Sequence, residues 1–121
     1  MMESEAALIN LRAAILANPS ASFVRLYFAT AHGRMGRDRE ARESIAEYLR
    51  MSPDLMAGKS EAEKTVMKAQ LELAARGYNL GVVDGRIGAF TQRAIAAFQR
   101  DEGIMETREL DSATIAKLGI A

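Results

Sequence analysis

The residues best suited to bind a ligand lie in one stretch, GYNLGVVDGRIGAFTQRAIAAFQ, residues 77–99. A glycan site needs an aromatic face for the sugar ring and a few fixed polar groups, and an arginine can pair with the carboxylate of a peptide. Phe90 interrupts the apolar stripe at a turn position, so we expect its ring to be exposed. The sequence therefore predicts a site for a glycan or a peptide formed by Tyr78, Asn79, Arg86, Phe90 and Arg93.

The same stretch carries residues that a tight turn and a buried helix face require. Gly85 and Gly88 allow backbone conformations that cost other residues steric energy. Side chains such as that of Asp84 accept hydrogen bonds from nearby backbone N–H groups. Solvated charges at a helix end are the alternative interpretation of Arg86 and Arg93. We expect a mainly structural role for Asp84, Gly85, Gly88, Thr91, Phe98 and Gln99.

The residues for known kinds of catalysis are missing. The chain has no cysteine and one histidine, His32, which excludes thiolate metal sites and makes a Ser-His-Asp or His-based zinc site unexpected. A packing or hydrogen-bonding role is the simplest interpretation of His32. We therefore expect a noncatalytic protein with no metal and no cofactor.

The charge balance and the hydropathy of the chain argue against two kinds of partner, nucleic acid and the membrane interior. Lys and Arg number 16 and Asp and Glu number 16, so no net charge attracts nucleic acid. No apolar run approaches the roughly 18 residues that cross a bilayer, so we expect no membrane insertion. The start of the chain, MMESEAALINLRAA, has glutamates where a signal peptide has lysines, so no export signal is visible.

Two segments with different patterns surround the candidate site, and we expect domains at residues 1–56 and 57–121, joined near DLMAGK. In the first segment, a shift that brings Pro19 onto Pro53 also brings small and large apolar residues into register. The paired residues are Ala7 with Ala41, Leu11 with Ile45, and Ile15 with Leu49. Between the prolines, two helical stripes flank Gly33 and Gly36, which predicts a helical hairpin after a lone helix. The stripes are Phe23, Leu26, Tyr27 and Thr30, then Ala41, Ile45, Tyr48 and Leu49.

The second segment predicts three short helices joined by glycine-rich turns. Ser60 and Glu63 form a capping box that opens the first helix, and Gly77 ends that helix as a left-handed cap. Gly103 ends the second helix, and Asp111 can cap the third. The chain is thus predicted to be all-α.

Residues 7–53 resemble a tetratricopeptide repeat. Gly36 matches that family's turn glycine, Ala41 its small contact residue and Ile45 its large apolar residue, whereas Arg25 and Tyr48 depart from the pattern. Phe28 and Ala29 match the large–small pair of the first helix. The family implies a scaffold for protein contacts. Such units bury their apolar faces only against neighbours, so we expect the chain to be the C-terminal part of a longer protein, or to form a homodimer through its exposed N-terminal helix.

Fixed spacings also run through the C-terminal half. The motif D-G-x-x-G-x-x-T is met by Asp84, Gly85, Gly88 and Thr91; Gln70, Leu73 and Gly77-Tyr78 precede it, and Phe98-Gln99, Gly103-Ile104, Glu109-Leu110-Asp111 and Thr114 follow it. On these residues, residues 62–120 resemble the small peptidoglycan-binding domain of many bacterial cell-wall enzymes. The resemblance implies a three-helix bundle that binds the glycan or the stem peptide of the wall.

Two functions follow from the two resemblances. In the first, the chain binds peptidoglycan in the bacterial cell envelope, in the periplasm or facing the wall, and the helical hairpin contacts a protein partner. In the alternative, the bundle has kept the fold without wall binding, and the chain is a cytoplasmic regulatory tail of a signalling protein that resembles the repeats following the catalytic domain of some bacterial nucleotide cyclases. The lack of tryptophan favours the alternative, and the D-G-x-x-G-x-x-T motif favours wall binding.

Overall fold

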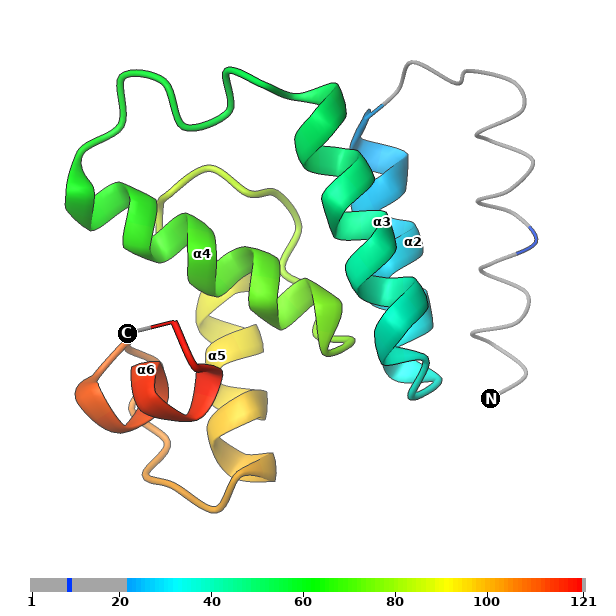
Figure 1. The fold of residues 1–121 in the computed structure, drawn as a ribbon. Coiled ribbons are helices and arrows are strands. Elements are labelled where there is room, and N and C mark those ends of the chain that lie inside the picture. Colours follow the sequence, from blue (N-terminus) through cyan, green and yellow to red (C-terminus); the bar gives the residue numbers. More distant parts are fainter. Residues whose placement is uncertain (1–8, 10–21, 121) are drawn as a thin grey trace. The chain divides into compact units, whose positions relative to one another are not determined.

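The computed structural model of the protein describes Ile9 and residues 22–120. These residues form five helices and no strand, which confirms the all-α prediction. The helices are α2 (Ser22–Arg34), α3 (Asp38–Met51), α4 (Glu61–Ala75), α5 (Ala89–Asp101) and α6 (Ser112–Leu118) (Figure 1). The lone helix predicted around Ala7, Leu11 and Ile15, and the homodimer contact through it, fall outside the described residues.

The chain divides into two compact units. Unit 1 comprises Met1–Ala57 together with Ala74–Gly77, and unit 2 comprises Gly58–Leu73 together with Tyr78–Ala121. The last turn of α4 thus belongs to unit 1, and the rest of that helix belongs to unit 2.

The helices α2 and α3 of unit 1 pack side by side as the predicted hairpin (Figure 1). The turn between them passes through Gly36, whose φ of 73° is the left-handed conformation that favours glycine. Ala29 and Ala41 are fully buried, which lets the two backbones approach closely.

Two residues of the predicted stripes do not face the core. Tyr27 is 39% exposed and Leu49 is 36% exposed. Each follows a buried residue, Leu26 and Tyr48 respectively, and one step along a helix turns the side chain by about 100°. The sequence pattern placed both neighbours on one face, whereas in these two pairs only Leu26 and Tyr48 are buried.

Gly33 explains why residues 74–77 belong to unit 1. A Cβ atom at Gly33 would lie 2.5 Å from the Ala75 carbonyl oxygen and 2.5 Å from the Gly77 nitrogen, so backbone meets backbone there. Arg34 Nε also donates a hydrogen bond to the Gly77 carbonyl oxygen at 3.0 Å. The sequence pattern places Gly33 between the two helices of the hairpin, whereas α2 continues to Arg34 and Gly33 provides this contact.

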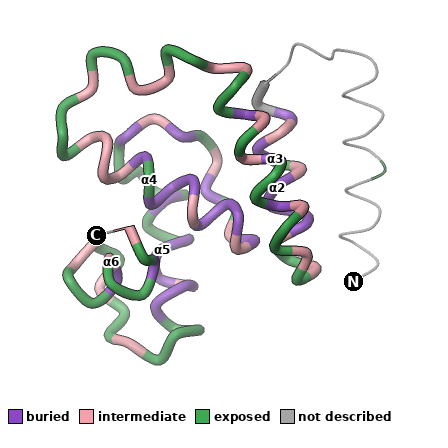
Figure 2. Tube along the Cα trace, viewed as in Figure 1, coloured by how far each residue is buried: buried purple, intermediate pink, exposed green. Residues whose placement is uncertain are grey.

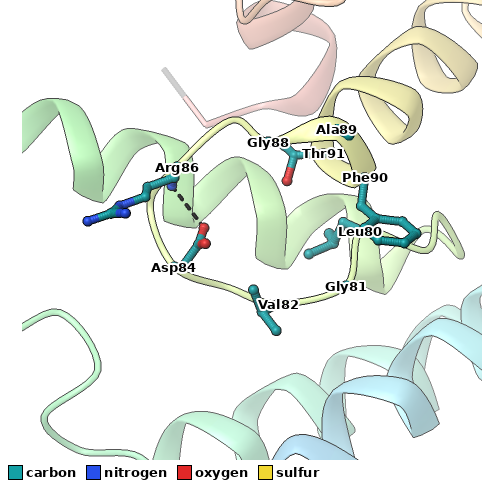
Figure 3. A pocket seen from close by; sticks show the side chains of 9 residues that line it. All are labelled: Leu80, Gly81, Val82, Asp84, Arg86, Gly88, Ala89, Phe90 and Thr91. Atoms are coloured by element: carbon teal, nitrogen blue, oxygen red, sulfur yellow. Dashed lines mark hydrogen bonds between the residues drawn. The ribbon is translucent and has the colours of Figure 1, made fainter.

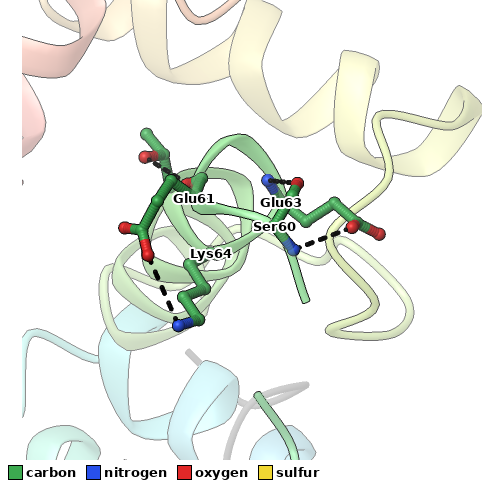
Figure 4. A network of polar contacts seen from close by, with 5 residues as sticks. Ser60, Glu61, Glu63 and Lys64 are labelled. Carbon is green, nitrogen blue, oxygen red and sulfur yellow. Dashed lines mark hydrogen bonds and ion pairs between the residues drawn. The ribbon is translucent and has the colours of Figure 1, made fainter. Parts of the chain in front are cut away.

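The helix ends of unit 2 follow the sequence signals. At the start of α4, Ser60 N donates to Glu63 Oε1 at 3.0 Å and Glu63 N donates to Ser60 Oγ at 3.2 Å, which is the predicted capping box (Figure 4). Gly77 has a φ of 92° beyond the end of α4. Asp111 caps α6, because its Oδ1 accepts a hydrogen bond from Thr114 N at 3.0 Å.

The core of unit 2 gathers the inner faces of its helices, drawn as buried in Figure 2. Its largest fully buried apolar side chains are Met67, Leu73, Ile95, Phe98 and Leu118. Two glutamines, Gln70 on α4 and Gln99 on α5, are also 0% exposed. A buried amide is costly unless its hydrogen bonds are satisfied, and each glutamine satisfies them on the loop that follows its own helix.

Gln70 holds loop 1, defined as residues 80–88. Its Oε1 accepts hydrogen bonds from Asp84 N at 3.1 Å and Gly85 N at 3.0 Å. Its Nε2 lies within hydrogen-bond distance of Asp84 Oδ1, the Arg86 carbonyl oxygen and Thr91 Oγ1, at 3.0–3.2 Å. The two amide protons are thus shared among three acceptors, and the loop is fixed to the core through one side chain.

Gln99 holds loop 2, defined as residues 103–111, in the same manner. Its Oε1 accepts hydrogen bonds from Thr107 N at 2.9 Å and Arg108 N at 3.0 Å. Its Nε2 donates toward Thr107 Oγ1, the Glu109 carbonyl oxygen and Thr114 Oγ1, at 2.8–3.1 Å. Gln99 thus fixes loop 2 to the core through one side chain, as Gln70 fixes loop 1.

Unit 2 thus contains two loops that are held in the same way, each by a buried glutamine. The equivalent positions, related by a constant spacing, are Asp84 and Thr107, Gly85 and Arg108, Gly88 and Asp111, and Thr91 and Thr114. Gly85 has a φ of 79°, and Arg108, with a φ of 65°, is the non-glycine residue with a positive φ among the described residues. The equivalence explains this strained arginine, because the glutamine-held loop requires the left-handed conformation at that place.

Candidate binding site

A pocket of about 260 Å³ opens on loop 1 and the first turn of α5 (Figure 3). Two of its lining residues, Phe90 and Arg86, belong to the predicted site. Its walls are mainly apolar, and its polar atoms come from few side chains. The lining residues are Leu80, Gly81, Val82, Asp84, Arg86, Gly88, Ala89, Phe90 and Thr91.

Asp84 is the negative charge of the pocket. Its Oδ1 accepts hydrogen bonds from Arg86 N at 2.9 Å and from Gln70 Nε2 at 3.1 Å, and Figure 3 shows the first of them. Burial raises the pKa of Asp84, but these hydrogen bonds and the nearby Arg86 charge outweigh burial and lower the pKa below its ordinary value of 3.8. Asp84 is therefore ionised at neutral pH, and its contacts support the expected structural role.

Phe90 lies at the open side of the pocket. Its side chain is 59% exposed, as its turn position predicts. The guanidinium carbon of Arg93 lies over the Phe90 ring, 5.4 Å from its centroid, within the range of a cation–π contact. We call these two residues in contact the Phe90–Arg93 pair.

The other three predicted site residues are not gathered with this pair. Figure 3 shows the Arg86 side chain pointing away from Phe90. Tyr78 donates a hydrogen bond from its hydroxyl to Asp101 Oδ2 at 2.6 Å and contacts the edge of the Phe98 ring, and it does not line the pocket. The Oδ1 atom of Asn79 accepts a hydrogen bond from Gly81 N at 3.3 Å in a local turn.

Gly88 does not have the predicted backbone conformation that only glycine adopts easily. Its φ of −88° is a conformation open to any residue, and a Cβ atom there would meet nothing within 4 Å. Only Gly85 of the two glycines has a left-handed φ, and a Cβ at Gly85 would lie 3.1 Å from the Glu63 carbonyl oxygen. The prediction treated both glycines alike, and it was wrong for Gly88, which is simply the N-cap residue of α5.

The sequence did not predict that Leu80 and Val82 line the pocket or that Gln70 holds its loop in place. Leu80 is buried and Val82 is 61% exposed, yet both line the pocket. The pair Val82-Val83 gave a usable signal, because one of two successive valines in an extended loop must point outward. The role of Gln70 gave no local signal, since its partners lie farther along the chain.

Two kinds of site are not found in the described residues, Ile9 and 22–120. No helix there is long and apolar enough to cross a membrane. No group of three or more His, Asp or Glu residues there is arranged to hold a metal ion.

Comparison with known protein families matches residues 62–118 to a family described as "Putative peptidoglycan binding domain". The matched range contains both glutamine-held loops and the pocket. Neither the comparison with curated proteins nor that with solved structures finds a match. Nothing in the comparisons supports a tetratricopeptide repeat at residues 7–53, and that resemblance stays a prediction.

Proposed function

On the premise that residues 62–118 carry a peptidoglycan-binding domain, we propose that the chain binds bacterial peptidoglycan without catalysing a reaction. The family match carries this proposal. The pocket on loop 1 supports it, because it combines an exposed aromatic ring with nearby charged groups. The site proposed is the Phe90–Arg93 pair with the pocket walls Leu80 and Val82.

The proposal has a cellular setting and a second partner. A chain that binds peptidoglycan would act in the cell envelope of a bacterium. The hairpin of α2 and α3 would then contact a protein, and the exposed apolar side chains Tyr27 and Leu49 support that role. The regulatory tail remains the alternative if the wall is not bound.

A sedimentation assay with purified, insoluble peptidoglycan tests the proposal. The wild-type chain should sediment with the wall at micromolar concentration, and Phe90→Ala should leave a larger share in the supernatant. Met105→Ala is the matched control, because Met105 is an 80% exposed apolar side chain on loop 2. Circular dichroism should show the same helicity for all three chains.

The outcomes separate the site from the function. Equal sedimentation of Phe90→Ala and the wild type would keep wall binding and move the site elsewhere. Absence of the wild type from the pellet would contradict the proposed function, and a search for protein partners of the α2–α3 hairpin would follow.

A further inference from the structure

Loop 2 and the start of α6 show which residues are needed to build a glutamine-held loop and to start the helix after it. Thr91 and Thr114 occupy equivalent places at the third residue of α5 and of α6. Counted from these threonines, Phe90 and Arg93 correspond to Ala113 and Ala116. Since α6 forms with alanine at both places, the Phe90–Arg93 pair is not needed to build the loop or to start the helix.

The Phe90–Arg93 pair is also not part of the buried core of unit 2. Phe90 is mostly exposed, and Arg93 is exposed as well. Phe90 leaves apolar area in contact with water, and its cation–π contact with Arg93 offsets only part of that cost. A bound ligand that covers the ring would remove this apolar area from water.

The polar groups of the pocket fit a sugar poorly. Sugar recognition needs several hydrogen-bonding groups that are directed at the ligand. Asp84 Oδ1 and Thr91 Oγ1 already accept hydrogen bonds from Gln70 Nε2, which leaves Asp84 Oδ2 as the carboxylate oxygen of the pocket that can accept from a sugar hydroxyl. Arg93 lies over the Phe90 ring, so that face is occupied where a sugar ring would stack.

The walls and charges fit an amino-acid residue of a peptide. The pocket, about 260 Å³ in volume, has room for an aliphatic side chain and the peptide groups beside it. Leu80, Val82 and Phe90 offer apolar contacts, and the guanidinium of Arg93 can pair with a carboxylate beside that side chain. Asp84 is ionised and repels a carboxylate from its own part of the pocket. The Arg86 side chain points away from Phe90 (Figure 3), so Arg93, which lies over the Phe90 ring, is the cation beside the apolar walls.

We infer that the pocket recognises the stem peptide of peptidoglycan rather than its glycan. An aliphatic side chain of the peptide enters between Leu80, Val82 and Phe90, and a neighbouring peptide carboxylate pairs with Arg93. This inference rests on the proposed function and names the part of the wall that the site binds.

The test uses soluble probes with the full chain, labelled with ¹⁵N. A synthetic stem pentapeptide with free carboxylates should shift the backbone amide signals of residues 80–91. The same peptide with all its carboxylates amidated, and the tetramer of N-acetylglucosamine, should leave these signals in place. Arg93→Gln, which keeps a long polar side chain without the charge, should weaken binding of the free peptide by at least about tenfold. Met105→Ala should bind as the wild type does.

The possible results distinguish a failure of the stem-peptide inference from a failure of the proposed function. If the chain sediments with intact peptidoglycan but the sugar tetramer, not the peptide, shifts residues 80–91, the inference is overturned and the proposed function stands. The same holds if the wall is bound and neither probe shifts these residues, or if Arg93→Gln binds the peptide at full strength. If the chain does not sediment with the wall, both are overturned.

Discussion

At the scale of single residues, two neutral amides organise unit 2. Gln70 and Gln99 are fully buried, and each offers its carbonyl to two backbone N–H groups and its NH₂ group to three acceptors. An amide can do this because it donates and accepts at once, which neither a carboxylate nor an ammonium group can do. The two glutamines therefore satisfy loop groups that would otherwise be buried without a partner.

Gln70→Glu should destabilise the protein strongly. The carboxylate has the same shape but cannot donate to Thr91 Oγ1 or to the Arg86 carbonyl oxygen, and it places a second negative charge beside Asp84. We expect the free energy of unfolding at pH 7 to fall by about 3 kcal/mol or more, measured by urea denaturation. Gln92→Glu, at an exposed position of α5, should change it by less than about 0.5 kcal/mol. Equal effects of the two substitutions would refute the role given to Gln70.

Gly85 and Arg108 should respond in opposite directions. Gly85→Ala combines a left-handed φ with a Cβ contact of 3.1 Å to the Glu63 carbonyl oxygen, so the free energy of unfolding should fall by about 1–3 kcal/mol. Arg108→Gly removes the strain at the equivalent place, and the entropy that glycine adds to the unfolded chain offsets part of the gain. We expect a change between zero and about 1 kcal/mol of added stability. A clear loss of stability in Arg108→Gly would contradict the equivalence of the two loops.

These residues also show which parts the sequence could predict. The capping box of Ser60 with Glu63 and the cap at Asp111 were predictable because their partners lie three residues away. The exposure of Phe90 followed from its turn position. The role of Gln70 was not predictable, since its bonds reach Asp84 and Thr91 across a loop whose path no local pattern fixes. Arg86 and Phe90 both line the pocket, but the Arg86 side chain points away from the ring, because closeness in sequence does not fix the direction of a side chain.

At the scale of elements, the three helices of unit 2 begin in different ways. The helix α4 has a reciprocal capping box, α6 has the Asp111 carboxylate, and α5 has Gly88, which offers no side-chain cap. The start of α5 is instead tied to the core through the bond from Gln70 to Thr91. The pocket of the proposed site thus lies at a helix start that has no side-chain cap and is held by a long-range contact.

The cap of α6 predicts a dependence on acid pH. Hydrogen bonds from the Thr114 hydroxyl, the Thr107 hydroxyl and Thr114 N lower the pKa of Asp111 below its ordinary value of 3.8. A carboxyl with a lowered folded-state pKa stabilises the fold fully above its unfolded value and loses that contribution as the pH falls through the folded value. Asp111→Asn should therefore have a lower Tm than the wild type at pH 7, and the difference should shrink as the pH falls below 3.8. A difference in Tm that is constant from pH 7 to pH 2 would contradict this assignment.

At the scale of the whole molecule, the matched family and the compact units do not share their boundaries. The family covers residues 62–118, whereas the last turn of α4 belongs to unit 1. The close contact of Gly33 with Ala75 and Gly77 accounts for this assignment. The binding pocket nevertheless takes all its lining residues from unit 2.

A chain of residues 57–121 should therefore retain the proposed binding of peptidoglycan. We expect it to keep the helicity of α4, α5 and α6 by circular dichroism and to sediment with peptidoglycan within about twofold of the full chain. Its Tm should be lower, because the contacts of Gly33 and Arg34 with the end of α4 are removed. Loss of both helicity and sedimentation would mean that the first segment is part of the folding unit.

The buried glutamines have a consequence for the rate at which the protein exchanges its amide hydrogens with water. Irregular loops usually exchange within seconds, because their N–H groups face solvent or open by local motion. The N–H groups of Asp84, Gly85, Thr107 and Arg108 donate instead to amide carbonyls inside the core. These four loop hydrogens should exchange as slowly as those in the middle of α5, so that the irregular loops open only when the bundle itself opens.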